Sequence, residues 1–296
     1  MNIQQPLVSI ITVNFRQPHV TVALLESIVQ NSYKKVEVIL VDNGSLADFS
    51  VLFKKAYPSV KIIISAENLG FAGGNNVGIA KAAGDFLFFV NNDTILTDGL
   101  IEGLLSRFAK NPQIGVVSPK IRYYDKPDTI QYAGFTEIHA ITGRNIAIGK
   151  NEIDNGQHDV AYSTAYAHGA AMMVSRKVIE KVGFMPEEFF LYYEELDWCA
   201  HIRRAGFSIW YEPEGLIYHK ESASVGKMNA LKTYYLTRNR LLFMRRNVKG
   251  WRLASFLTYF YAVTFPIKTI SFLAKQDFTL FVTFCQASLN FKKGAH

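Results

Sequence analysis

Residues 8–13 (VSIITV), 36–41 (VEVILV) and 86–90 (FLFFV) are continuous apolar runs rich in β-branched or aromatic side chains. Runs of this kind are typical of strands buried on both faces of a parallel sheet. Between them, residues 18–30 and 71–83 carry apolar or small side chains at helical spacing. This alternation predicts an α/β fold in which helices flank a mostly parallel central sheet.

The same alternation continues on both sides of an irregular, polar segment at residues 121–165, which we expect to form hairpins or a loop over the site. The further strands and helices that the pattern predicts are strands at 61–64, 115–118, 168–176, 207–211 and 216–219 and helices at 49–57, 98–110, 177–182 and 194–205.

Polar side chains follow the predicted strands at the points where the strands end. They are Asn14, Asp42-Asn43, Glu67-Asn68 and Asn91-Asn92-Asp93. In open α/β sheets, ligands bind beyond the carboxyl ends of the strands. We therefore expect the functional site at this edge, although turn formation alone also explains Asn and Asp at such positions.

The net charge of +7 is divided unevenly along the 296 residues. Residues 1–221 hold 20 Lys and Arg against 24 Asp and Glu, whereas residues 222–296 hold 12 Lys and Arg against one acid, Asp277. The whole-chain charge suggests a nucleic-acid-binding protein, but an acidic body disfavours that class, and we expect no nucleic acid partner. We expect a body at 1–221 and a basic, aromatic-rich helical tail at 222–296.

Two distant cysteines, Cys199 and Cys285, make no disulfide framework, and the N-terminus lacks the basic region of a signal peptide. Both features favour a reducing, cytoplasmic compartment. The longest uncharged runs, 253–267 and 278–289, are shorter than a membrane span. They suit the surface of an anionic bilayer instead, because lysines and arginines flank them.

A metal-binding pair and a cluster of acids are candidates for chemistry. Asp93, at a strand end, suits a hard divalent cation, and His219, at the end of a later strand, could ligate the same ion. Glu194, Glu195 and Asp197 crowd the start of a predicted helix, where helix capping is the alternative role. Crowding and burial would raise the pKa of one of them toward the range of a general base.

A glycine-rich segment at residues 70–78 opens a predicted helix. It could present backbone N–H groups to a phosphate, but its glycine spacing matches neither G-x-G-x-x-G nor a P-loop. Close packing of the helix on the sheet is the alternative explanation.

Taken in order, seven segments resemble the inverting glycosyltransferases of family 2, which have the Rossmann-like GT-A fold, and in particular their bacterial rhamnosyltransferase-like members. The resemblance covers roughly residues 6–245. Its segments are VSIITVNF (8–15), VDNGS (41–45), ENLGFAGGNN (67–76), FVNNDT (89–94), HGAAMMVSR (168–176), FFLYYEELDWCAHIRRAGF (189–207) and IYH (217–219).

The resemblance implies a division of labour among these residues. Residues 1–120 would bind the nucleotide of the donor, through Thr12, Asn14 and Asp42 at the base and ribose and through Asn68 and Asn92 nearby. Residues 121–221 would form the acceptor half, with His168 and Trp198 lining the acceptor pocket.

The resemblance also assigns the metal and the base. Asn91-Asn92-Asp93 takes the place of the metal-binding D-x-D motif with its first acid replaced, so that Asp93 and His219, with Asn91, would hold Mg²⁺ or Mn²⁺. Glu195 matches the catalytic base, where the family usually has Asp, and Asp197 and Glu194 are the alternatives for that role. Arg238 would reach a diphosphate of the donor or the acceptor.

The implied activity is the transfer of a sugar, L-rhamnose being one candidate, from a dTDP- or UDP-sugar to a saccharide or polyprenyl-diphosphate-linked saccharide in cell-surface polysaccharide synthesis. The implied location is the inner face of a bacterial plasma membrane. A weak or inactive homologue stays open because of the Asn91 and Glu195 departures. Packing of the tail on the body, or a homodimer, is the alternative to membrane binding, and clustering of the acids disfavours a glycoside hydrolase.

Overall fold

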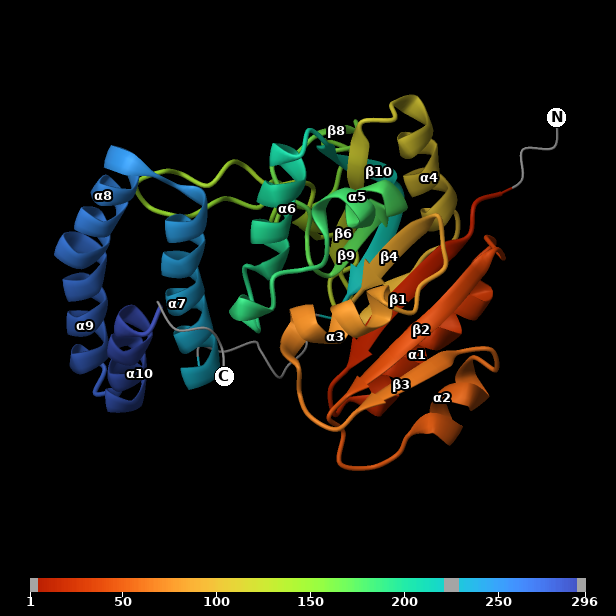
Figure 1. Cartoon of the computed structure of the whole chain (residues 1–296), viewed down its shortest axis with the longest axis horizontal. Coiled ribbons are helices and arrows are strands. Elements are labelled where there is room, and N and C mark those ends of the chain that lie inside the picture. The colour runs from red at the N-terminus through yellow and green to blue at the C-terminus, as the bar shows by residue number, and fades with distance from the viewer. Residues whose placement is uncertain (1–4, 221–228, 292–296) are drawn as a thin grey trace.

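The computed structural model describes residues 5–220 and 229–291, and the predicted boundary at 221/222 lies outside these residues. Figure 1 shows a sheet with helices on both faces and a separate group of helices, α7 to α10, beside it. The strands are β1 Val8–Asn14, β2 Val36–Asn43, β3 Lys61–Ser65, β4 Phe86–Val90, β5 Thr94–Leu96, β6 Ile114–Tyr123, β7 Ile130–Tyr132, β8 Tyr162–Ser163, β9 Ala171–Ser175 and β10 Ser208–His219. The helices are α1 Pro18–Gln30, α2 Ser50–Ala56, α3 Gly70–Ile79, α4 Leu100–Lys110, α5 Arg176–Val182, α6 Glu194–Arg204, α7 Ala230–Asn247, α8 Gly250–Tyr259, α9 Phe265–Ala274 and α10 Phe278–Leu289, with a 3₁₀ turn at Glu187–Phe189 and a π-helical turn at Phe260–Thr264.

The central sheet has the order β3-β2-β1-β4-β9-β6-β10-β5. Strands β3, β2, β1 and β4 are parallel, as the apolar runs predict. In the second half of the sheet β10 is parallel to β6, whereas β9 departs from the parallel pattern and runs antiparallel to both β4 and β6. The fold is therefore a mixed α/β sheet, and β9 brings residues 168–170 to the edge where β4 ends.

Strand β10 corrects a second expectation, since the predicted strands at 207–211 and 216–219 are one strand of 12 residues. Its parallel pairing with β6 shifts register between Glu212 and Leu216. Pro213 and Gly215 lie within this shift, where a bulge accommodates residues that interrupt a ladder. The bulge carries the strand on to His219.

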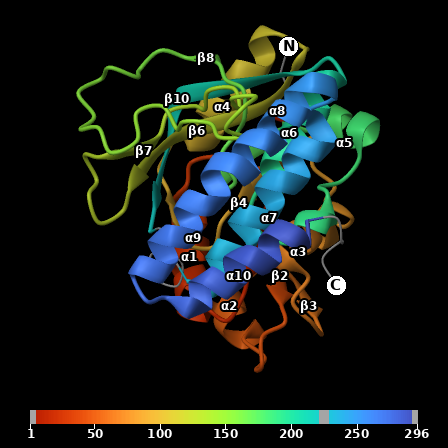
Figure 2. The ribbon, with the colours of Figure 1, turned by 90° about the vertical axis from the view of Figure 1, so that its left-hand side faces the viewer.

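Two apolar cores enclose the sheet. Helices α1, α2 and α4 pack on one face, through residues such as Leu24, Phe53 and Leu104, and α3, α5 and α6 pack on the other. The glycine-rich segment at residues 70–78 packs closely on the sheet, which is one of the two explanations that the sequence leaves open for its glycines. A Cβ on Gly78 would meet the Ile11 side chain at 2.4 Å. Helix α7 then extends the second core toward α8, α9 and α10, which Figure 2 shows in front of the sheet.

Helices α8 and α9 join through the π-helical turn into one continuous helix, Gly250–Ala274. The turn precedes Pro266, whose ring would clash with the carbonyl of the preceding turn in a regular α-helix. The wider π-helical turn relieves this clash, so that the helix continues. Its 25 residues are long and apolar enough to cross a membrane by length and composition. The expectation that no apolar segment reaches this length is therefore wrong, because the helix extends beyond the uncharged run at 253–267.

Candidate functional site

The carboxyl ends of β1 and β2 carry a network of polar side chains. The Asn14 amide donates to Asp42 Oδ1 at 2.8 Å, and the Thr21 hydroxyl donates to Asn14 Oδ1 at 2.8 Å. The Asn92 amide in turn donates to Thr21 Oγ1 at 3.0 Å. The structure thus brings the predicted donor-binding residues Asn14, Asp42 and Asn92 together through Thr21, a residue that the motifs do not single out.

Two other predicted nucleotide-binding residues differ in exposure. Thr12 is fully buried, and its hydroxyl has no hydrogen-bond partner within residues 5–220 and 229–291. Asn68 is exposed, and its side-chain oxygen accepts from Asn43 Nδ2 and the Gly70 N–H, both at 3.0 Å. Thr12 therefore lies beneath the site in this structure, and direct contact of its side chain with a nucleotide stays a prediction.

Asp93 and His219 meet at the carboxyl ends of neighbouring elements, because β10 pairs with β5 directly after Asp93. His219 Nε2 lies 3.1 Å from Asp93 Oδ1, and His219 Nδ1 lies 2.8 Å from Gln131 Oε1. Gln131 fixes one ring nitrogen, so that the other faces a carboxylate oxygen. Two acceptors at this distance need a proton or a cation between them.

A divalent cation fits this pair. Carboxylate and imidazole are suitable donors for such an ion, and here the two face each other across 3.1 Å. Across the described residues, no group of three or more His, Cys, Asp or Glu side chains could hold a metal ion. Mg²⁺ or Mn²⁺ would thus bind through Asp93, His219 and Asn91 and complete its shell with water and ligand phosphates, as Mg²⁺ usually does.

A cavity of about 360 Å³ contains this pair and the acids of α6. The predicted site residues that line it are Asn91, Asp93, His168, Glu194, Glu195 and His219. They arrive from the ends of β4, β9 and β10 and from the start of α6. The predicted base and the predicted metal ligands therefore share one cavity, whereas Asn14, Asp42 and Asn68, at the ends of other strands, lie outside its lining.

His168 forms an aromatic wall of this cavity. Its ring stacks on Phe135 with centroids 5.8 Å apart, and the Ala170 N–H donates to its Nδ1 at 3.0 Å. Burial, reinforced by the charge of His219, lowers the pKa of His168 to about 3. His168 is thus a neutral ring with its proton on Nε2, which suits contact with a sugar better than proton transfer.

Glu194 and Glu195 begin α6 at the inner end of the cavity. Glu194 is buried, and its Oε2 has no hydrogen-bond partner in the part of the chain that the structure describes. Burial and the charge of Glu195 raise the pKa of Glu194 well above its usual range, and burial raises the pKa of Glu195 to about 7. Glu195 therefore has the pKa of a general base at neutral pH.

Asp197 and Trp198 correct the sequence prediction. Asp197 is fully buried outside the cavity, where Arg246 Nε lies 3.2 Å from Oδ2 and Asn247 Nδ2 donates to Oδ1 at 2.5 Å. Trp198 is also fully buried, donating to the Gly183 carbonyl at 3.1 Å and packing edge-on against Phe89. Both residues support the fold here, because Asp197 is held by Arg246 and Asn247 and the Trp198 ring packs into the core.

Arg238 is a third correction, because it contacts backbone where a diphosphate ligand was expected. Its Nη2 donates to the Glu188 carbonyl at 2.8 Å, and the next residue, Asn239, donates to the carbonyls of Phe189, Leu191 and Tyr192 at 2.8 Å each. The segment held in this way includes Phe190, Tyr192 and Tyr193, all with positive φ. Arg238 and Asn239 therefore stabilise the strained turn that presents Glu194 and Glu195.

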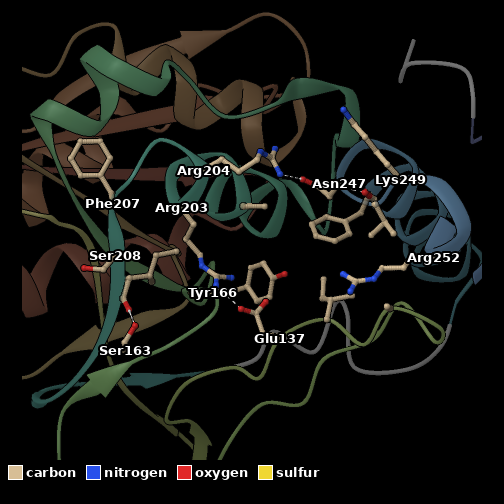
Figure 3. Close-up of a pocket in the computed structure, with 16 residues that line it drawn as sticks. Glu137, Ser163, Tyr166, Arg203, Arg204, Phe207, Ser208, Asn247, Lys249 and Arg252 are labelled. Atoms are coloured by element: carbon tan, nitrogen blue, oxygen red, sulfur yellow. Dashed lines mark hydrogen bonds and ion pairs between the residues drawn. The ribbon is translucent and has the colours of Figure 1, made fainter.

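A larger cavity, of about 780 Å³, lies at the opposite end of α6 (Figure 3). Arg203 points to Glu137 there, and Arg204 points to Asn247, with nitrogen–oxygen distances of 2.5 and 2.7 Å. None of the predicted site residues lines this cavity. Its size therefore does not mark it as the reactive centre.

The comparisons with known proteins agree with the fold. The family model for glycosyl transferase family 2 matches residues 9–183. A rhamnosyltransferase of Mycobacterium tuberculosis, N-acetylglucosaminyl-diphospho-decaprenol L-rhamnosyltransferase, is 25% identical over 79% of this chain and 82% of its own length. The dTDP-rhamnosyl transferase RfbF of Shigella flexneri is 27% identical over 80% of this chain and 79% of its own length.

Some relatives are much longer than this chain. An uncharacterized protein of Sinorhizobium fredii, y4gI, is 28% identical over 82% of this chain, which spans only 28% of that protein. Among solved structures, GalNAc-T7 with UDP, GalNAc and Mn²⁺ has a TM-score of 0.64 at 15% identity, covering 87% of this chain and 50% of its own. The mannosyltransferase PcManGT of Pyrobaculum calidifontis, with GDP-Man and Mn²⁺, has a TM-score of 0.60 at 15% identity, covering 98% and 88%. These structures show the shared fold.

Proposed function

Because this chain belongs to glycosyl transferase family 2, we propose that it moves a sugar from a nucleotide diphosphate donor to a hydroxyl of a saccharide acceptor, with inversion at the anomeric carbon. One observation carries the proposal. Glu195, with a pKa raised by burial to about 7, lines the same cavity as the Asp93–His219 pair. A base and a place for a cation are the two things that such a transfer needs.

Glu195 takes the proton from the acceptor hydroxyl as the oxygen attacks the anomeric carbon. The new carbon–oxygen bond forms while the bond to the diphosphate breaks on the opposite face, so that the configuration inverts. Asp93, His219 and Asn91 would hold Mg²⁺ or Mn²⁺, which would supply positive charge to neutralise the departing diphosphate. Asn14, Asp42 and Asn92 orient the nucleotide, and Phe135 and His168 exclude water from the acceptor side.

The names of the relatives support the choice of substrates. Proteins named as rhamnosyltransferases match most of this chain, so we assign dTDP-L-rhamnose as the first donor to test and a UDP-sugar as the second. The acceptor that we assign is a saccharide linked to a polyprenyl diphosphate, the kind of substrate in the name of the mycobacterial relative. The reaction belongs to the synthesis of a cell-surface polysaccharide.

A lipid-linked acceptor places the protein at a membrane surface, and helices α8 and α9 suit that place. Their exposed side chains combine apolar groups with cations, an arrangement that favours an anionic bilayer. The exposed apolar residues are Trp251, Tyr261, Val263, Ile267, Ile270 and Leu273, and the cations along the same helix are Arg252 and Lys268. We assign peripheral binding at the inner face of a bacterial plasma membrane.

Flotation with phosphatidylglycerol vesicles tests this placement. Ile270→Glu should reduce the vesicle-bound fraction, whereas Leu46→Glu, at an even more exposed apolar residue on the body, should leave it unchanged. Unchanged flotation of the Ile270 variant, together with a smaller mass in sedimentation, would favour the homodimer instead.

Calorimetric titration tests the activity itself. dTDP or UDP should bind with Mn²⁺ present, and Asp93→Ala should weaken that binding by at least about tenfold, since it removes the charged ligand. Equal affinity of wild type and Asp93→Ala would contradict the metal site. Metal-dependent binding without transfer to any prenyl-diphosphate saccharide would favour the inactive homologue.

A further inference from the structure

A smaller cavity, of about 260 Å³, lies between α7, α9, α10 and the loop that follows β7. Three cations from three different segments line it, namely Arg144, Arg240 and Lys268. No Asp or Glu is among the residues that line it in the described ranges. A concave site with cations alone attracts an anion.

Arg240 is the unusual member of this group. Its side chain is 7% exposed, and its Nε is buried without a hydrogen-bond partner among residues 5–220 and 229–291. Its guanidinium lies over the Phe260 ring, 5.1 Å from the centroid. Burial lowers the pKa of Arg240, since no carboxylate compensates its charge. A buried cation normally has an anionic partner, so the cavity has the character of a site whose partner is a ligand.

Hydroxyl and aromatic groups complete the cavity. Thr233 Oγ1 is buried and also lacks a partner in the part of the chain that the structure describes. Phe272 from α9 and Phe284 from α10 form an apolar side. The lining therefore suits a ligand that carries a phosphate group at one end and hydrocarbon at the other.

The position of this cavity links it to the reactive centre. Tyr193 lines it, whereas Tyr192 and Glu194 line the cavity with the base. On α7, Thr233 lines the cavity of Arg240, and Lys232 lines the cavity with the base. The two cavities thus adjoin across the turn before α6 and the first turn of α7.

We propose that the cavity of Arg144, Arg240 and Lys268 binds the diphosphate of a prenyl-linked acceptor, with the first part of the prenyl chain on Phe272 and Phe284. This inference rests on the proposed function, and it names the part of the acceptor that the enzyme recognises. It replaces Arg238, whose guanidinium contacts backbone, with Arg240 on the other side of α7.

Titration calorimetry of the full chain with farnesyl diphosphate tests the proposal. Farnesyl diphosphate should bind to the wild type, and Arg240→Gln should weaken that binding about tenfold, the value of a charge-assisted contact. Lys268→Gln, at a half-buried position with little effect on folding, should weaken it in the same direction. Lys275→Gln, at an exposed cation just after α9 and outside the cavity, is the matched control and should bind as the wild type does.

Three outcomes would overturn the proposal. They are wild-type affinity in both cavity variants, equal binding of farnesol, and displacement of farnesyl diphosphate by phosphatidylglycerol vesicles, which would make the cavity a phospholipid headgroup site. Titration of dTDP or UDP with Mn²⁺ into the same samples separates this result from the proposed function. Nucleotide binding should be unchanged in Arg240→Gln, and its absence in the wild type would contradict the transferase assignment alone.

Discussion

Two cavities lie on either side of the turn before α6, and different charged groups line them. Glu194, Glu195 and Asp93 line one cavity together with Lys150 and Lys232, whereas Arg240 lines the other with two further cations and no acid in the described lining. Lys120, a buried cation elsewhere in the chain, is paired with Asp154 at 2.9 Å. Glu194 Oε2 and Arg240 Nε have no hydrogen-bond partner among the described residues, and burying such groups costs free energy, so these two cavities are the ones to associate with ligands.

Of the variants that test this difference between the two cavities, Glu195→Gln should have the largest effect, and that effect is on turnover. The variant should lower turnover by about 10²–10⁴-fold, the usual contribution of a general base, while the affinity for nucleotide and Mn²⁺ stays near that of the wild type. Single-turnover transfer assays, with calorimetry on the same samples, measure both. Near-normal turnover would remove Glu195 from the mechanism.

Asp197→Asn sharpens the contrast between two acids of α6, namely Asp197, which is paired with Arg246, and Glu195, which lines the cavity. The substitution leaves Arg246 without its buried partner and should cost about 2–5 kcal/mol in the free energy of unfolding, while turnover per folded molecule is retained. Denaturant unfolding and the transfer assay report the two quantities. Lost turnover with unchanged stability would move the base from Glu195 to Asp197.

Gln131→Met tests whether the imidazole of His219 is held for a cation. The substitution preserves volume but removes the acceptor from Nδ1, and loss of such a supporting contact should weaken Mn²⁺-dependent nucleotide binding about 10–100-fold. Gln113→Met, at an exposed position away from the cavity, serves as the control. Equal affinity of wild type and Gln131→Met would mean that His219 is not a ligand.

Glu194→Gln should give the smallest effect, and its sign depends on pH. The folded chain favours the protonated carboxyl because the pKa of Glu194 is raised, whereas the unfolded chain ionises near 4.5. The wild type thus loses stability as pH rises above about 4.5, and the neutral variant does not. The melting temperature of Glu194→Gln should exceed that of the wild type at pH 7, by about 2–4 °C for each kcal/mol gained in the free energy of unfolding. At pH 4 the two melting temperatures should match. A variant less stable at pH 7 would show that the carboxylate is ionised and satisfied.

The fold follows from the sequence wherever apolar runs are uninterrupted. Strands β1, β2 and β4 and helix α1 lie where their patterns place them. The direction of β9 does not follow, because an apolar strand buried on both faces reads the same in a parallel and an antiparallel ladder. The unity of β10 does not follow either, since a proline and a glycine at 213 and 215 are signals for a turn as much as for a bulge.

The candidate site was predictable at strand ends and less so on helices. Residues two apart on a helix lie on nearly opposite sides, and this separates Glu195 from Asp197 and Arg238 from Arg240. Only the packing of α7 against α6 decides which member of each pair faces a cavity. Gln131 lies on a strand of three residues within the irregular segment, where no periodic signal singles it out.

The pH dependence of transfer tests the central claim, that Glu195 is the base, most directly. The initial rate of nucleoside diphosphate release, with the proposed donor and acceptor at subsaturating acceptor, should rise with pH and level off above about 7, where the carboxyl is ionised. The residual rate of Glu195→Gln should lack this rise. A wild-type rate that is flat from pH 5.5 to 8.5 (a range of about 1.5 units on either side of that pKa), or an unchanged rise in the Gln variant, would contradict the account.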